Sequence, residues 1–178
     1  IPLGTHSAEV LRKTRLHLDA SRSASLFAER LLLVEGVTEA AVLRELGWVW
    51  ANADPDKQSF VDALSIVPMG TKVGPWAVRL LATQGHELCS RLAVLRDSDL
   101  DYDQTPTPPS WASEHNSNVL LVEHNHPTLE PQLTKGNEKL ISGALKDIGV
   151  AVPKQVTPQS IRDLFRSKHK DGEKIVPA

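Results

Sequence analysis

The chain of 178 residues contains a single cysteine, Cys89, so an internal disulfide is excluded. The lack of disulfides is typical of proteins in a reducing compartment, and a cytoplasmic location is therefore the default expectation. A lone cysteine is most often a small, buried side chain of apolar character, and we expect this role for Cys89.

Long apolar runs are also missing from the sequence. No stretch approaches the roughly 20 apolar residues that a membrane-spanning helix needs, so we expect no membrane association. The first residues lack the basic and apolar regions of a signal peptide. The sequence starts at Ile1 without an initiator methionine, which is typical of a fragment of a longer protein or of a processed start.

Neither sign of charge dominates, because 20 Lys and Arg residues stand against 22 Asp and Glu residues. Bulk charge therefore neither demands nor excludes a nucleic-acid partner, and any basic surface must be local. With 40% hydrophobic residues, the chain is long enough for one well-filled core but short for two ordinary domains. We expect one domain with short additions at its ends.

The apolar run at residues 31–34 leads directly into an acid, Glu35, then a glycine and, three residues further on, a second acid, Glu39. A short apolar run bounded by a glycine turn predicts a buried strand, and Thr38 is a residue type that can cap the helix that follows. Glu35 and Glu39 are therefore expected at the carboxyl edge of a sheet, where open α/β folds carry out their chemistry.

Four apolar segments predict strands, at residues 30–34, 64–69, 91–96 and 118–122. Helices are expected between and around them, at residues 7–28, 38–47, 75–83, 137–148 and 160–167, with a short one opened by Thr128. Strands that alternate with helices predict an α/β fold, in which a mostly parallel sheet is flanked by helices.

The turns between these elements carry their own signals. Gly70 follows the second predicted strand, and a glycine at such a turn lets the backbone approach a ligand or a neighbouring loop. Residues 52–59 are polar and predict a loop after Trp48 and Trp50, whose rings we expect to cover an edge of the core rather than to stack on bases. Residues 104–116 contain three prolines, which disfavour regular structure.

Acids alternate with other residues directly after the third predicted strand, at Asp97, Asp99, Asp101 and Asp103. In a parallel sheet, Asp97 and Asp99 would lie at the same edge as Glu35 and Glu39. Carboxylates in such a cluster need a cation, and hard oxygen ligands favour Mg²⁺ or Mn²⁺. Two such ions about 3.5–4 Å apart can activate a nucleophile and stabilise the leaving oxygen of a phosphodiester.

This order of motifs resembles the TOPRIM domain that topoisomerases, primases and some nucleases share. The resemblance rests on Glu35-Gly36 after one strand, Gly70 after a later one, and Asp97-Ser98-Asp99 after a third. More narrowly, residues 34–39 together with Thr128-Leu129-Glu130 are similar to the nuclease half of OLD (overcoming lysogenisation defect) family proteins. The resemblance covers residues 24–178.

The resemblance implies a DNA endonuclease that uses two Mg²⁺ or Mn²⁺ ions. Its metal ligands would be Glu35, Glu39, Asp97, Asp99 and Glu130. Glu35 and Asp97 would be catalytic together with a lysine of the C-terminal tail, for which Lys174 fits best, while Lys168 and Lys170 stay open.

The resemblance also implies an organisation of the chain and its partners. Residues 1–28 would be a helical connecting segment, residues 29–135 the TOPRIM catalytic core, and residues 136–178 a helical extension with a basic tail. In that family an ATPase domain precedes the TOPRIM domain, so we expect an ATPase domain of the same full-length protein as a partner. A homodimer would suit cleavage of both DNA strands.

Two other functional classes stay open. Acids at strand ends and a lysine also describe a phosphoacceptor receiver domain, which would acquire a labile acyl phosphate. A non-catalytic interaction module would bind no divalent metal. A topoisomerase would need a nucleophilic tyrosine, and Tyr102, the only tyrosine, lies within the acidic run.

Several candidate residues also have simpler roles. Glu35 and Glu130 would suit a helix start, where the helix dipole favours a carboxylate. Glu39 would suit a solvated helix face. His124 and His126 are expected to be polar loop residues rather than metal ligands or a general base, because no cysteine partner lies nearby.

Overall fold

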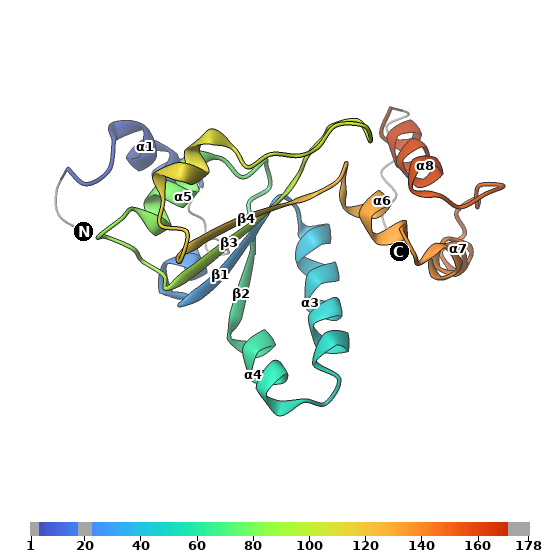
Figure 1. The fold of residues 1–178 in the computed structure, drawn as a ribbon, viewed down its shortest axis with the longest axis horizontal. Helices are drawn as coiled ribbons and strands as arrows, with labels where there is room; N and C mark the ends of the chain where they lie inside the picture. The colour runs from blue at the N-terminus through green and yellow to red at the C-terminus, as the bar shows by residue number, and fades with distance from the viewer. Residues whose placement is uncertain (1–3, 18–22, 171–178) are drawn as a thin grey trace. The chain divides into compact units, whose positions relative to one another are not determined.

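The computed structural model of the chain describes residues 4–17 and 23–170 (Figure 1). One four-stranded sheet has the strand order β2-β1-β3-β4. Its strands are β1 (Arg30–Val34), β2 (Leu64–Pro68), β3 (Arg91–Asp97) and β4 (Leu120–Asn125). Parallel pairing and flanking helices confirm the predicted α/β class, with a Rossmann-like arrangement.

The chain divides into two compact parts, which we describe separately. Among the described residues, the sheet part lies within Ile1–Arg96 and Thr107–Glu123, and the helical part within Asp97–Pro106 and His124–Ala178. The predicted domain ranges, 1–28, 29–135 and 136–178, stay a prediction.

Helices of the sheet part are α1 (Ala8–His17), α3 (Val37–Ala51), α4 (Pro55–Ala63) and α5 (Pro75–Ala82), with short 3-10 helices η1 (Ala24–Phe27) and η2 (Ser110–Glu114). The helical part contains α6 (Leu129–Thr134), α7 (Glu138–Asp147) and α8 (Pro158–Lys170). Within the stretches that the structure describes, no helix combines the length and the apolar character needed to cross a membrane.

The core of the sheet part lies on one face of the sheet, under α1 and α5. Successive side chains of a strand point to opposite faces, so Leu31 and Leu33 of β1 share this face and are both 1% exposed. Leu92 and Val94 of β3 join the same cluster, and six of the eight residues of α5 are buried against it. This apolar packing fixes the sheet on which the acidic motifs lie.

Three local predictions differ from the structure. Residues 55–63 form helix α4 instead of a loop, because Pro55 occupies its first turn and the Asp54 carboxylate accepts the amides of Asp56 and Lys57 at 3.0 and 3.3 Å. Helix α3 runs through both tryptophans to Ala51. Strand β4 extends to Asn125, beyond the predicted end at residue 122.

Trp48 and Trp50 do not join the core cluster, so the expectation that they cover an edge of the core is wrong. Their exposed fractions are 41% and 54%. Trp50 packs edge-on against Phe60 of α4, and the Lys57 ammonium lies 5.0 Å from its ring centroid. Trp50 therefore links α3 to α4.

Replacement of Leu33 by alanine should lower the free energy of unfolding by about 2–5 kcal/mol, because it leaves a cavity in the buried face of the sheet. Chemical denaturation of the purified chain measures this change. Leu121 of β4 is 56% exposed, so Leu121→Ala is a matched control and should cost less than about 1 kcal/mol. Equal losses for the two variants would contradict the placement of the core.

Candidate functional site

The acidic motifs lie at the carboxyl ends of strands of the sheet. Glu35 is the first residue after β1, and Asp97 is the last residue of β3. Strands β1 and β3 are parallel neighbours, paired in register from Arg30 with Arg91 to Leu33 with Val94. Both strands therefore end at the carboxyl edge of the sheet, the side at which α/β proteins of this kind bind ligands.

In the sheet part, the turn that carries Glu35 is tied to the turn after β2. The amide of Met69 donates to the carbonyl of Val34 at 2.9 Å, and the amide of Gly70 donates to the carbonyl of Glu35 at 2.8 Å. Gly70 has φ +72°, a conformation that favours glycine. The expectation that Gly70 lets the backbone approach a neighbouring loop is confirmed.

Gly36 makes room for the side chain of Glu39. A Cβ atom on Gly36 would lie 2.7 Å from Glu39 Oε2, so the carboxylate folds back over the start of α3. Gly36 itself is the N-cap residue of α3, and Thr38 lies inside the helix, so the predicted capping role of Thr38 is wrong. Glu35 and Glu39 are both half-buried. The first turn of α3 thus brings a second carboxylate back toward Gly36, the residue that follows Glu35.

In the helical part, residues 97–99 are tied to residues 125–127. The amide of Ser98 donates to the carbonyl of Asn125 at 2.9 Å, and the amide of Asp99 donates to that of Pro127 at 3.1 Å. Asn125 is 5% exposed, and its side-chain Nδ2 donates to Asp97 Oδ1 at 3.1 Å. Asp99 has φ +57°, a left-handed conformation that aspartate tolerates better than most residues. The backbone and side chain of Asp97 are therefore both oriented.

The rest of the acidic run is held by an arginine from α8. Arg162 is 6% exposed, and its Nη2 donates to Asp101 Oδ1 at 3.1 Å and to the carbonyl of Leu100 at 3.3 Å. Its guanidinium carbon also lies 5.4 Å from the centroid of the Tyr102 ring. Asp101 thus serves to anchor the run, whereas Asp97 and Asp99 lie before this anchor.

Glu130 lies in the first turn of α6. The hydroxyl of Thr128, the N-cap residue of this helix, donates to Glu130 Oε2 at 3.0 Å. Glu130 is half-buried. This geometry suits the helix-start role of Glu130, and the carboxylate keeps further lone pairs for a cation.

The structure leaves the five predicted ligands in separate groups. Glu35 and Glu39 belong to the sheet part, whereas Asp97, Asp99 and Glu130 belong to the helical part. Across residues 4–17 and 23–170, no three His, Cys, Asp or Glu side chains stand together as a metal-binding group. Every donor in the predicted set is a carboxylate oxygen, and such a set fits Mg²⁺ or Mn²⁺ rather than a soft metal.

The structure does not test the predicted role of a lysine in the C-terminal tail. Lys174 lies outside the described residues. Lys168 and Lys170, the two alternatives, belong to the last turn of α8.

Three residues that position the acidic run were not predicted from the sequence. Asn125 orients Asp97, His126 lies 2.9 Å from Ser98 through its Nδ1, and Arg162 anchors Asp101. The histidine and the asparagine lie in a polar stretch whose pattern indicated only a turn after a strand. Arg162 is 61 residues from Asp101, and no local pattern signals such a pair.

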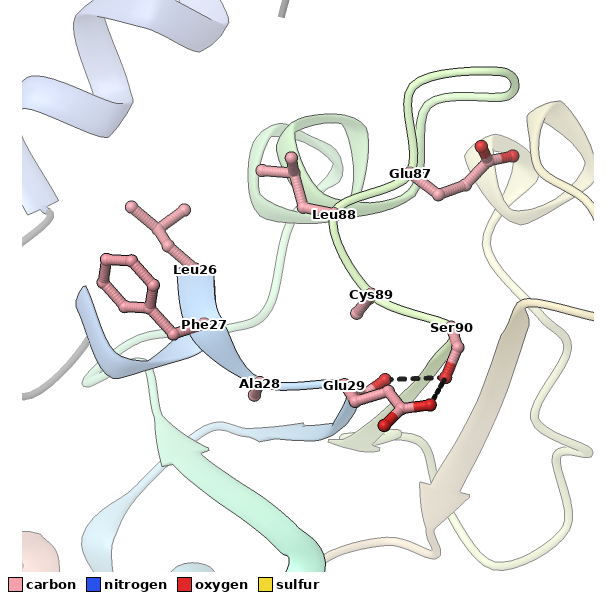
Figure 2. A pocket seen from close by; sticks show the side chains of 8 residues that line it. All are labelled: Leu26, Phe27, Ala28, Glu29, Glu87, Leu88, Cys89 and Ser90. Atoms are coloured by element: carbon pink, nitrogen blue, oxygen red, sulfur yellow. Dashed lines mark hydrogen bonds between the residues drawn. The ribbon is translucent and has the colours of Figure 1, made fainter.

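A shallow pocket of about 450 Å³ lies at the amino end of the same strands (Figure 2). Figure 2 shows the Ser90 hydroxyl, which donates to the carbonyl of Glu29 at 3.0 Å and to its Oε1 at 3.5 Å. Cys89 lines this pocket but is only 5% exposed, which confirms its buried role, and burial raises the pKa of its thiol. None of the predicted ligands lines this pocket.

Asn125→Ala should lower the free energy of unfolding by about 1–3 kcal/mol, because a partly buried carboxylate oxygen of Asp97 loses this donor. Thermal or chemical denaturation measures the change. Asn118 is exposed, and Asn118→Ala should stay within about 0.5 kcal/mol of the starting chain. If both variants unfold at the same denaturant concentration as the starting chain, Asn125 does not hold Asp97 as described.

Comparisons with known proteins found no relative of this chain. No family model, no curated protein and no solved structure matches the chain. The function must therefore be argued from the residues at the strand ends.

Proposed function

We propose that the chain is a metal-dependent endonuclease that hydrolyses phosphodiester bonds of DNA, with the TOPRIM-like organisation of an OLD family nuclease half. One observation carries this proposal: Glu35 directly follows β1 and Asp97 is the last residue of β3, and these are two neighbouring parallel strands of an α/β sheet. Chemistry in such folds is performed at the carboxyl ends of the strands.

In this proposal Glu35, Glu39, Asp97, Asp99 and Glu130 hold Mg²⁺ or Mn²⁺, with two ions as the expected number. Bound ions of this kind supply an activated water and the charge that stabilises a leaving oxygen. A tail lysine, Lys174 or one of Lys168 and Lys170, neutralises charge that develops on the phosphate. DNA and an ATPase domain of the full-length protein are the proposed partners, and a homodimer would serve double-strand cleavage.

The chain's own contribution is to hold these carboxylates before substrate arrives. The Gly70 amide restrains the backbone of Glu35, Gly36 leaves space for the Glu39 carboxylate, and the Asn125 amide fixes one oxygen of Asp97. Ligands that are already oriented lose less conformational freedom when an ion binds. This support is local in each part of the chain.

A receiver-like signalling domain remains the second candidate, because the strand order β2-β1-β3-β4 is also the start of the flavodoxin-like order. A small phosphodonor with Mg²⁺ separates the two functions: a receiver would acquire an acyl phosphate on an aspartate and would not nick DNA.

Purified chain should convert supercoiled plasmid to nicked and linear forms with Mn²⁺ or Mg²⁺, and EDTA should stop the reaction. Glu35→Ala and Asp97→Ala should each lower the nicking rate by more than about 100-fold, since loss of even an outer-shell group at a metal site costs about 10- to 100-fold. Gel electrophoresis over a time course measures the rate.

Two exposed acids provide matched controls for the nicking experiment. Glu45 of α3 and Asp62 of α4 are exposed and lie within helices, so Glu45→Ala and Asp62→Ala should nick at the starting rate. A rate that Glu35→Ala and Asp97→Ala leave unchanged would overturn the assignment of the site.

Gly36→Ala should weaken Mn²⁺ binding by about 10-fold, because the new methyl group displaces the Glu39 carboxylate that it meets at 2.7 Å. Stability should fall by about 1 kcal/mol, because alanine is a poorer N-cap residue than glycine. The angle φ −127° adds no strain, and the atom that must move ends a flexible side chain. Calorimetric titration with Mn²⁺ measures the affinity.

Gly143 of α7 is the control for Gly36, because a Cβ atom there would meet nothing within 4 Å. Gly143→Ala should leave Mn²⁺ affinity unchanged and raise stability by about 0.5–1 kcal/mol through its helix propensity. Unchanged Mn²⁺ affinity in Gly36→Ala would remove Glu39 from the ligand set.

A further inference from the structure

The helical part contains a pocket that none of the predicted metal ligands lines. Its volume is about 520 Å³, within the range of roughly 300–1,000 Å³ that small-molecule sites occupy. Rings of Tyr102 and His126 form part of the wall, and Gln132, Lys135 and Gln159 add polar groups. All of its lining residues belong to this one part of the chain.

We propose that this pocket binds an unstacked nucleobase of a single-stranded nucleic-acid segment. The inference rests on the proposed nuclease function and names a substrate subsite for it. A base needs a flat apolar surface for its ring and hydrogen-bonding groups for its edge, and the pocket provides both kinds of group.

The ring of Tyr102, which forms part of the pocket wall, is held by contacts with His126 and Arg162. Tyr102 is 39% exposed, so part of its ring is open to a ligand, and its centroid lies 6.0 Å from that of His126 in an edge-on arrangement. The buried guanidinium of Arg162 lies 5.4 Å from the Tyr102 ring and is itself bonded to Asp101. A ring supported in this way offers a base a fixed stacking surface at low entropic cost.

The polar wall presents both donors and acceptors. Gln132 accepts the backbone amide of His126 through Oε1 at 3.4 Å, which leaves its NH₂ group to donate. Gln159 donates to Asp163 at 2.9 Å through Nε2, which leaves its Oε1 to accept. A base edge carries the complementary set of donors and acceptors, whereas a purely apolar ligand would leave these groups unpaired.

Charged groups at the pocket suit a nucleotide more closely than a neutral heterocycle. Lys135 supplies a cation for a flanking phosphate. The carboxylate of Glu138 accepts a hydrogen bond from the amide of Gly136 at 3.0 Å. Hydrogen bonds from its own amide and from that of Gly136 lower the pKa of Glu138. Glu138 is therefore an anionic acceptor for the N–H groups of a base.

The pocket is linked to the predicted ligands through one hydrogen bond. His126 Nδ1 lies 2.9 Å from the hydroxyl of Ser98, the residue between Asp97 and Asp99. Tyr102 follows Asp99 by three residues in the same acidic run. A base in this pocket would therefore hold its strand next to the segment that carries both aspartates, which is the purpose of a substrate subsite.

Binding of a short single-stranded DNA oligonucleotide with one 2-aminopurine tests the proposal on the full chain in EDTA, where no cleavage takes place. Stacking in the pocket should quench the 2-aminopurine fluorescence on binding. Tyr102→Ala should weaken binding by about 10-fold or more, whereas Tyr102→Phe, which keeps the ring, should stay within about twofold. Gln159→Ala, an exposed position, should weaken binding without a loss of stability.

Two comparisons make the result specific for the pocket. An oligonucleotide with an abasic site in place of 2-aminopurine should bind more weakly to the starting chain, and Tyr102→Ala should remove this difference. Trp50→Ala deletes an exposed aromatic ring of the sheet part and should leave the affinity unchanged. The proposal that this pocket binds a base would be wrong if Tyr102→Ala bound the oligonucleotide as tightly as the unsubstituted chain. It would also be wrong if only Trp50→Ala lost affinity.

The outcome for the pocket is separate from the outcome for the nuclease function. Base-dependent binding without any metal-dependent nicking would contradict the nuclease function but support the base-binding role of the pocket. Nicking by a chain that binds abasic and intact oligonucleotides equally would support the nuclease function but contradict the base-binding role of the pocket. Binding of a peptide with no response to the oligonucleotide would also overturn it.

Discussion

The backbone hydrogen bonds that continue past the strand ends are the interactions on which the site depends. After β1, the amides of Met69 and Gly70 keep the turn of Glu35 paired with the turn that follows β2. After β3, the amides of Ser98 and Asp99 pair with residues 125 and 127. The backbone of each acidic motif is therefore held by main-chain hydrogen bonds in its own part of the chain, and side-chain hydrogen bonds from Asn125 and Arg162 add to them in the acidic run.

This constraint explains which residue types stand at the strand ends. Gly70 and Asp99, which pair with neighbouring turns, have positive φ angles, and Gly36 lacks the Cβ atom that would meet the Glu39 carboxylate. The buried side chains of Asn125 and Arg162 donate hydrogen bonds to carboxylates of the acidic run. Buried polar groups are stable only when they have such partners. Within each part, the turns that carry the acids are thus held by hydrogen bonds without any bound ion or substrate.

The strand cores and the acids that follow β1 and β3 were predictable, because apolar runs and glycine turns are local signals that the sheet preserves. Helix α4 was missed because its start depends on an aspartate cap next to a proline, and the polar composition of residues 52–59 hid that signal. The partners of the acidic run were not predictable, since Arg162 reaches Asp101 across 61 residues and Asn125 acts from a strand that was expected to end earlier. Long-range polar pairs leave no periodic pattern in a sequence.

The central claim is that these carboxylates are ligands of divalent metal ions. Anomalous scattering from crystals of the full chain grown with Mn²⁺ tests it most directly, because each ion is located without reference to activity. The account predicts anomalous peaks within coordination distance of carboxylate oxygens of Glu35 and Asp97, about 2.0–2.1 Å for a Mg²⁺-like octahedral ion. Peaks confined to histidine nitrogens, or no peak at either acid at saturating Mn²⁺, would contradict it.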